Sequence, residues 1–93
     1  MADAVPTKTQ IEAALLAIIR QRGPTSSACP SEVARALSPH AWRALMPHVR
    51  EVAMQLAQRG LLDISQGGQS VVPDGLWKGP IRLRQKNPTI SSN

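Results

Sequence analysis

The sequence predicts a mainly α-helical domain with a small antiparallel β-hairpin, arranged as a winged helix-turn-helix of three helices plus a wing. Residues 31–60 contain a short apolar-patterned run, a loop and a longer apolar-patterned run, which is the outline of two packed helices. Another helical pattern precedes them. After them, two short alternating segments flank a Gly67-Gly68 pair, which can adopt the positive φ angles of a tight hairpin turn. The sequence supports this architecture better than it supports any one function.

The length of 93 residues is that of one domain with a single compact core. Hydrophobic residues make up 42% of the chain but aromatic residues only 2%, so aliphatic side chains must fill the interior. We expect a disordered N-terminus over residues 1–8, the winged-helix domain over 9–84 and a disordered tail over 85–93.

The first helix is predicted over residues 9–22. Thr9 and Glu12 fit a capping box, in which the threonine hydroxyl accepts from the backbone N–H of Glu12 and the carboxylate reaches back. The Gly23-Pro24 pair then supplies a C-terminal cap and a stop. Apolar residues recur on one helical face, which we assign to the core. They are Ile11, Ala14, Leu15, Ile18 and Ile19.

The second helix is predicted over residues 30–38. Pro30 suits its first position, and the carboxylate of Glu32 meets the positive end of the helix dipole in its first turn. The helix ends near Ser38, because the residue before a proline is pushed out of helical geometry. The β-prone residues 25–29 that precede this helix can form an edge strand against the hairpin.

The third helix is predicted over residues 46–59, with Pro47 in its first turn and Gly60 as its end. Residues 40–46 form a linker longer than that of a minimal helix-turn-helix, and the A-W-R-A-L run in it can form a helical turn packed by Trp42. The inward stripe of the third helix is Leu45, Val49, Val52, Ala53 and Leu56. That orientation turns outward Arg50, Glu51, Met54 and Gln58.

In the hairpin, we expect residues 61–66 to pair with residues 69–73 across the two glycines. A two-residue turn pairs Gln66 with Gln69, Ile64 with Val71 and Leu62 with Pro73. The buried face of the hairpin then consists of Leu62, Ile64 and Val71.

A basic strand follows within residues 78–86, where Ile81 and Leu83 alternate with Arg82 and Arg84 as in a half-buried strand. Residues 75–93 carry four positive charges and no acid: Lys78, Arg82, Arg84 and Lys86. The whole chain has eleven Lys and Arg against six Asp and Glu, a net charge of +5. This balance favours polyanionic partners such as nucleic acid, although many small domains carry such a charge for solubility.

The sequence offers little support for an enzyme, because it shows no nucleophile with a base and no paired carboxylates. Cys29, His40 and His48 do not have the spacing of a zinc site. Cys29 is the single cysteine, which we interpret as a small, partly buried thiol. We therefore expect no catalysis, no metal and no cofactor.

We also expect a cytoplasmic protein. No run of apolar residues approaches the roughly 18 that a membrane span needs. The first residues lack the basic-then-apolar layout of a signal peptide.

Three motifs together resemble a bacterial family of small domains of unknown function. They are P-S-E-V-A-R-A-L at residues 30–37, W-R-A-L-M-P-H-V-R at 42–50 and G-P-I-R-L-R at 79–84. The resemblance covers roughly residues 10–84 and implies a winged-helix-like fold in a bacterial, cytoplasmic setting, but no activity or ligand. More loosely, residues 49–62 are similar to the recognition helix and first wing strand of many bacterial transcriptional regulators.

The first functional hypothesis is binding of duplex DNA, with the helix over 46–59 in the major groove and the basic strand on the phosphates. The residues nearest the bases would be Arg43, His48 and Arg50, and those on the phosphates Lys78, Arg82 and Arg84. Useful specificity would require a homodimer or a tandem partner to double the contacts. Glu51 and Met54 oppose this hypothesis, because one repels phosphate and the other reads no base edge.

The alternative hypothesis is a protein-interaction module on the same scaffold. Met54 and its neighbours would then form the contact surface, and the basic strand would meet an acidic protein partner.

Overall fold

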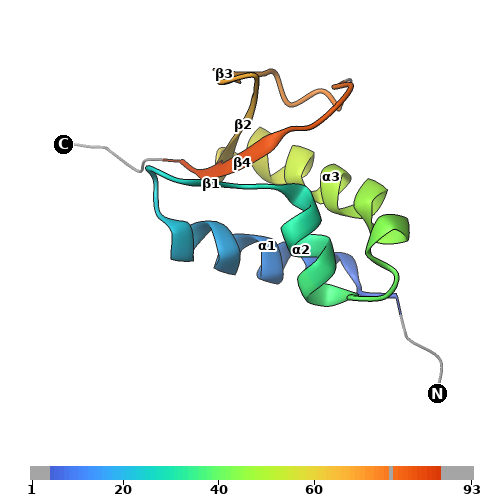
Figure 1. The fold of residues 1–93 in the computed structure, drawn as a ribbon. Coiled ribbons are helices and arrows are strands. Elements are labelled where there is room, and N and C mark those ends of the chain that lie inside the picture. The colour runs from blue at the N-terminus through green and yellow to red at the C-terminus, as the bar shows by residue number, and fades with distance from the viewer. Residues whose placement is uncertain (1–4, 76, 87–93) are drawn as a thin grey trace.

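The computed structural model describes residues 5–75 and 77–86, which form three helices and a four-stranded antiparallel sheet (Figure 1). In chain order the elements are α1 (Lys8–Arg22), β1 (Ser27–Ala28), α2 (Pro30–Leu37), α3 (Trp42–Gln58), β2 (Leu62–Gln66), β3 (Gln69–Ser70) and β4 (Arg82–Gln85). The helices lie on one side of the sheet. This arrangement confirms the predicted fold class and is consistent with a winged-helix layout.

Helix α1 begins at Lys8, two residues after Pro6, and the predicted capping box at Thr9 and Glu12 is wrong. Thr7 is the N-cap instead: its Oγ1 accepts from the backbone N–H of Gln10 at 3.1 Å, and its own N–H donates to Gln10 Oε1 at 2.8 Å. Both pairs match the Thr-x-x-Glu/Gln pattern, so local sequence could not choose between them.

The turn between α2 and α3 is shorter than predicted. Helix α2 ends at Leu37 and α3 begins at Trp42, which leaves only four residues, 38–41, between them. The predicted linker over residues 40–46 is therefore too long, but the predicted helical turn in the A-W-R-A-L run is confirmed, since Trp42 begins α3 and Ala41 is its N-cap. Pro47 lies inside α3 rather than in its first turn. Its missing N–H costs the helix one hydrogen bond, which the burial of the neighbouring Leu45 and Val49 offsets.

The strand order is β1-β4-β2-β3, so β4 lies in the interior of the sheet. Residues 27–28 form an edge strand as expected, but it pairs with β4 and not with the hairpin. The hairpin turn at Gly67-Gly68 pairs Gln66 with Gln69 as predicted, with φ angles of 60° and 84° at the two glycines.

The second arm of the hairpin is shorter than the predicted 69–73, because β3 ends at Ser70. The N–H of Val71 still donates to the carbonyl of Ile64 at 2.9 Å. The predicted pairing of Leu62 with Pro73 is wrong. The chain leaves the sheet after Val71 and turns toward α3, where the carbonyl of Pro73 accepts from Gln58 Nε2 at 2.8 Å.

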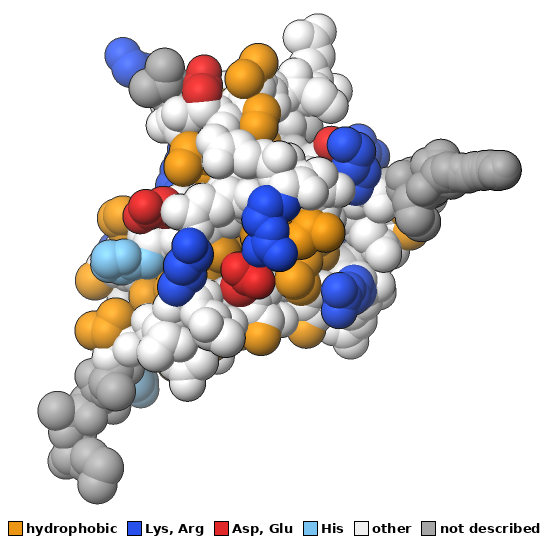
Figure 2. Space-filling model, turned by 180° about the vertical axis from the view of Figure 1, so that it is seen from behind, with side chains coloured by type: hydrophobic (Ala, Val, Ile, Leu, Met, Phe, Trp, Pro, Cys, Tyr) orange, Lys and Arg blue, Asp and Glu red, His pale blue; other side chains and the backbone are white. Residues whose placement is uncertain are grey.

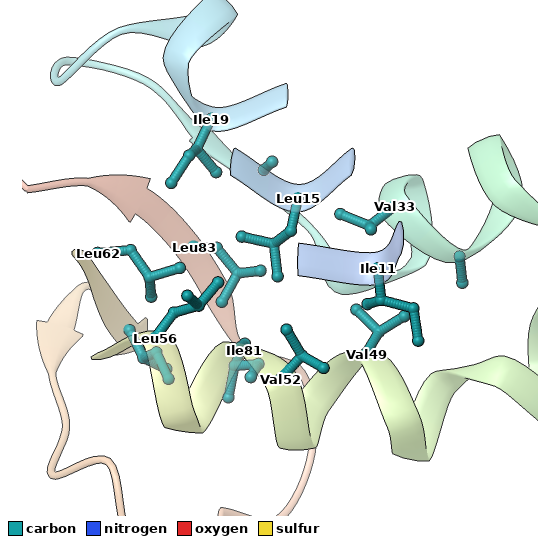
Figure 3. Packing of buried hydrophobic residues seen from close by; sticks show 14 of the residues in the cluster. Ile11, Leu15, Ile19, Val33, Val49, Val52, Leu56, Leu62, Ile81 and Leu83 are labelled. Atoms are coloured by element: carbon teal, nitrogen blue, oxygen red, sulfur yellow. The ribbon is translucent and has the colours of Figure 1, made fainter. Parts of the chain in front are cut away.

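The core lies between the helices and the inner face of the sheet (Figure 3). The predicted stripe of α3 is buried throughout, as are Ile81 and Leu83 of the basic strand. Of the residues assigned to the core face, Ala14, Ile18 and Val71 are only half-buried. The buried residues are Ile11, Leu15, Ile19, Ala28, Val33, Ala34, Leu45, Val49, Val52, Ala53, Leu56, Leu62, Ile64, Ile81 and Leu83.

The predicted disordered termini fall largely on residues 1–4 and 87–93, which lie outside the described residues. The regular elements extend one residue beyond the predicted 9–84 at each end, since Lys8 begins α1 and Gln85 ends β4. Among the helices described, none is long and apolar enough to cross a membrane.

The burial of α3 predicts a large effect for Leu56→Ala. Leu56 is fully buried, so its truncation should lower the free energy of unfolding by about 2–5 kcal/mol through lost transfer energy and a cavity. Gln21→Ala, at an exposed position of α1, should change it by less than about 0.5 kcal/mol. Urea denaturation measures both values, and similar midpoints for the two variants would contradict the packing of α3.

Candidate nucleic-acid interface

Two arginines flank one tryptophan at the corner between α2 and α3. The guanidinium carbon of Arg35, on α2, lies 4.2 Å from the ring centroid of Trp42, and that of Arg43 lies 4.6 Å from it. Attraction to the electron-rich ring compensates for the repulsion between the two cations. Within the described residues, no acidic side chain forms an ion pair with either arginine. Both are exposed, so their N–H groups are available to an anion.

The same corner contains the beginning of α3. Ala41 is the N-cap and makes no side-chain hydrogen bond to the helix, and the first turn has no acidic residue. The free backbone N–H groups and the helix dipole add positive potential to that of Arg35 and Arg43. This corner, comprising Arg35, Trp42 and Arg43, is hereafter the arginine–tryptophan corner.

The predicted groove-facing residues do not all share one face of α3. Arg43 and Arg50 are seven residues apart and lie nearly in line, about 10 Å apart along the helix. His48 is turned about 140° from Arg43. It is exposed on the flank near the beginning of α1, where it borders a cavity of about 220 Å³ together with Pro6 and Lys8.

Arg50 contacts the segment between β3 and β4, whose described residues 71–75 and 77–80 we call the wing loop. Its Nη2 donates to the carbonyl of Gly79 at 3.1 Å and to that of Trp77 at 3.5 Å. Its guanidinium carbon also lies 6.0 Å from the centroid of the Trp77 ring. Arg50 is half-buried as a result, so a ligand can reach less of it than of Arg43.

Lys78 lies on the wing loop between the two residues that Arg50 contacts. Its backbone carbonyl accepts a hydrogen bond from Gln66 Nε2, and its side chain is exposed. The bonds of Arg50 to the two neighbouring carbonyls place the backbone of Lys78 beside Arg50, while the lysine borders a separate hollow together with Gln66 and Val72.

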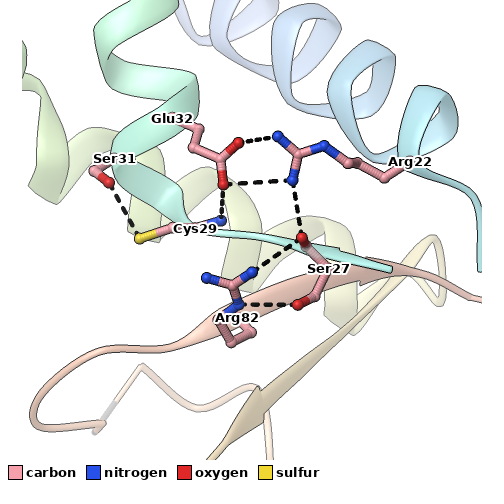
Figure 4. A network of polar contacts seen from close by, with 6 residues as sticks. All are labelled: Arg22, Ser27, Cys29, Ser31, Glu32 and Arg82. Atoms are coloured by element: carbon pink, nitrogen blue, oxygen red, sulfur yellow. Dashed lines mark hydrogen bonds and ion pairs between the residues drawn. The ribbon is translucent and has the colours of Figure 1, made fainter. Parts of the chain in front are cut away.

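Arg82 and Arg84 lie on the outer face of the sheet, because they alternate with the buried Ile81 and Leu83. Arg82 Nε donates to Ser27 Oγ at 2.9 Å and its Nη2 to the Ser27 carbonyl at 3.1 Å (Figure 4). Arg84 is exposed and lies opposite Asp63 in the register of β2 and β4. The sheet thus directs both arginines away from the helical layer, and they are separate from the arginine–tryptophan corner.

A polar network joins the end of α1 to the beginning of α2 near Arg82 (Figure 4). Glu32 accepts from the backbone N–H of Cys29 at 2.9 Å and forms an ion pair with Arg22, whose Nη1 also donates to the Ser27 carbonyl at 3.0 Å. The N–H of Cys29 is the main cause of a lowered pKa of Glu32, and the hydrogen bond from Arg22 adds to it. Cys29 is the half-buried N-cap residue of α2, and its Sγ accepts a hydrogen bond from Ser31 Oγ at 3.1 Å.

The positive charges do not gather into one patch on the face seen in Figure 2. Lys and Arg side chains are scattered over it, with acidic side chains between them. The net charge therefore gives less information about a binding surface than the local clusters do. No group of three or more His, Cys, Asp or Glu that could hold a metal ion occurs in the part of the chain that is described.

Sequence reasoning missed Arg35, although it named Arg43 and Trp42. Arg35 lies seven residues before Trp42 on another helix, and a longer linker would have separated the two. A correct prediction of the four-residue turn over 38–41 would have placed the two side chains close together.

Residues 8–86 match the family model described as "Protein of unknown function (DUF3253)". No curated protein matches the chain.

The lowered pKa of Glu32 predicts pH-dependent stability. A carboxyl whose pKa is lowered by folding stabilises the folded state above its unfolded pKa, near the ordinary value of 4.5, and loses this contribution as the pH falls through the folded pKa. Wild type should therefore be more stable than Glu32→Gln at neutral pH, and the difference should shrink below about pH 4.5. Urea denaturation from pH 3 to pH 7 measures it.

Glutamine at position 32 can still complete the capping box, so this substitution removes mainly the charge. Glu51→Gln, on the exposed side of α3, is the control for loss of a negative charge elsewhere. A difference between wild type and Glu32→Gln that stays constant over the whole pH range would contradict the role of the carboxylate.

Proposed function

The chain belongs to the family of unknown function that its residues 8–86 match, and from its own geometry we propose that it binds duplex DNA. The observation that carries the proposal is the arginine–tryptophan corner at the beginning of α3. An α-helix fits the major groove of B-DNA, and in helix-turn-helix proteins the first residues of the recognition helix contact the base edges. Arg43 occupies that part of α3, and Arg35 lies beside it.

We assign Arg43 to the groove and Arg35 to a nearby phosphate. An arginine can form two parallel hydrogen bonds to guanine O6 and N7, and guanidinium groups bind phosphate strongly. The free N–H groups at the beginning of α3 would add to the attraction for a phosphate. His48, on the flank of the helix, would lie at the margin of this contact.

Lys78, whose backbone lies beside Arg50 on the wing loop, would supply a further phosphate contact. Arg82 and Arg84 form a second basic surface on the outer face of the sheet. In this proposal they contribute less to the affinity for one duplex than the arginine–tryptophan corner does, because the sheet directs them away from α3.

The cellular setting is part of the proposal. A DNA-binding winged helix of this size would act in the cytoplasm of a bacterium, without a catalytic step. One monomer makes few contacts, so a homodimer would be needed to bind a specific site tightly.

The second candidate function is a protein-interaction module. The wing loop supports this function because it covers part of α3 and occupies Arg50 and Gln58 with internal hydrogen bonds. Glu51 is exposed nearby and would repel phosphate. In this case the open basic face at Arg82 and Arg84 would bind an acidic segment of a partner protein.

The DNA proposal predicts salt-dependent binding. With about four phosphate contacts, log affinity should fall against log salt with a slope of roughly −3 to −4. Arg35→Ala with Arg43→Ala should weaken binding more than Arg82→Ala with Arg84→Ala, although each pair removes two positive charges. Fluorescence anisotropy with a labelled random duplex at low salt measures both, and circular dichroism checks that the variants are folded.

Two outcomes would change the assignment. A larger effect from the Arg82 and Arg84 pair would make the sheet face the DNA surface. Absence of binding at roughly 50 μM protein, which is within the usual range of non-specific affinities, would exclude DNA as the ligand.

The interaction alternative has its own test. A labelled acidic peptide should bind wild type and lose affinity on Arg82→Ala with Arg84→Ala, while Arg35→Ala with Arg43→Ala should have little effect. Equal binding of the peptide to all three proteins would count against a specific basic face.

A further inference from the structure

We propose that Arg50 acts on DNA through the wing loop, by positioning Lys78, and does not read a base itself. The inference rests on the proposed DNA binding and adds to it a positioning residue on α3. Its basis is the place of Lys78 between the two carbonyls that Arg50 contacts.

The backbone around Lys78 is held from two elements. From α3, the Nη2 group of Arg50 donates to the carbonyls of Trp77 and Gly79, the residues on either side of Lys78. From β2, Gln66 Nε2 donates to the carbonyl of Lys78 and, at 3.3 Å, to that of Pro80. Four successive carbonyls, those of residues 77–80, therefore point to side chains of the folded domain, while the lysine side chain stays exposed.

The wing loop lies along α3 over three successive turns. Arg50, Met54 and Gln58 are four residues apart and form one stripe on the outer face of the helix. Gln58 Nε2 binds the carbonyl of Pro73, and a Cβ atom built on Gly75 would lie 2.8 Å from Met54 Sδ. The hydrogen bonds of Arg50 and Gln58 attach the loop at the two ends of this stripe, and a cavity of about 400 Å³ remains beside it.

Trp77 has two attachments, one within the loop and one to α3. The indole N–H of Trp77 donates to the carbonyl of Val72 at 2.9 Å. The backbone carbonyl of Trp77 accepts from the charged Arg50, and a hydrogen bond from a charged donor is stronger than a neutral one, so loss of Arg50 should also loosen the indole bond. Loss of Arg50 should free the carbonyls on both sides of Lys78 and leave Gln66 as the remaining support of this segment.

If Arg50 positions Lys78, the effects of the two residues on DNA affinity are coupled, whereas direct base contact by Arg50 would leave them independent. If Arg50 touched DNA independently, the losses from the two residues would multiply. If Arg50 positions Lys78, removal of the lysine should have no further effect once Arg50 is absent, because the contact is already lost.

The first experiment measures the loop without DNA. In NMR spectra, the indole N–H of Trp77 should exchange with solvent about tenfold faster in Arg50→Gln than in wild type, as expected for loss of a charge-assisted hydrogen bond. The indole of Trp42 is the internal reference. Unchanged exchange at Trp77 would show that Arg50 does not hold the loop and would overturn the inference.

The second experiment measures DNA affinity by anisotropy for Arg50→Gln, Lys78→Gln and the double variant. Each single variant should bind DNA about three- to tenfold more weakly than wild type. The double variant should bind no more weakly than whichever single variant has the lower affinity. Arg59→Gln removes the same charge from the end of α3 without contact to the loop, and controls for net charge. Losses that multiply in the double variant would overturn the inference but leave DNA binding intact.

A third variant displaces the loop without changing any charge. Gly75 has a φ of +78°, so Gly75→Val forces a β-branched residue into a strained backbone conformation. It should reproduce both the faster exchange at Trp77 and the loss of affinity in Arg50→Gln. If Gly75→Val shows the faster exchange at Trp77 but binds DNA as tightly as wild type does, the positioning role is contradicted. Absence of DNA binding by wild type would overturn the proposed function together with this inference.

Discussion

The burial of one face of α3 determines the arrangement of the rest of the molecule. Its stripe from Leu45 to Leu56 packs against α1, α2 and the inner face of the sheet. Once the buried face of a helix is fixed, the direction of every other side chain on it is fixed as well. Arg43 and Arg50 are therefore directed to the outer surface, and His48 is directed to the flank beside α1. Which cations can act together follows from this packing and not from their number.

The wing loop shows that polar residues on the outer face of a helix need not be available to a ligand. Backbone carbonyls that leave a sheet must find other hydrogen-bond partners. After Val71 the chain leaves the sheet, and Arg50, Gln58 and Gln66 supply donors to its carbonyls. Arg50 and Gln58 are thus structural partners of the loop, while Lys78 gains a defined position. The hydrogen bonds of Arg50 within the domain are a sufficient reason for a charged residue at this position, so its charge alone does not indicate a base contact.

The net charge of +5 is divided between surfaces with different surroundings. At the arginine–tryptophan corner, the guanidinium groups of Arg35 and Arg43 pack against the ring of Trp42, and neither forms an ion pair within the described residues. On the sheet, Arg82 and Arg22 both donate to the carbonyl of Ser27 in the edge strand β1. Side chains that cover an edge carbonyl also hinder the addition of another strand there. Arg22 and Arg82 thus stabilise the fold, so their charges are weaker evidence for a polyanionic ligand than the net charge suggests.

Local sequence determined the existence and type of most elements of this protein. The three helices, the turn at Gly67-Gly68 and the alternation of Ile81 and Leu83 with Arg82 and Arg84 were all predictable. These features depend on neighbours within a few residues, so periodicity and turn chemistry reveal them. The capping box at Thr7 was misplaced because two overlapping pairs satisfy the same local rule.

Only the tertiary structure decided which residues meet across elements. The four-residue turn over 38–41 brings Arg35 to Trp42, the insertion of β4 between β1 and β2 directs Arg82 and Arg84 away from α3, and the departure of the wing loop from the sheet occupies Arg50. Each of these contacts joins residues whose relative positions depend on how whole elements pack. Local propensity contains no information on that packing, because the energy that selects it comes from burying the faces of several elements at once.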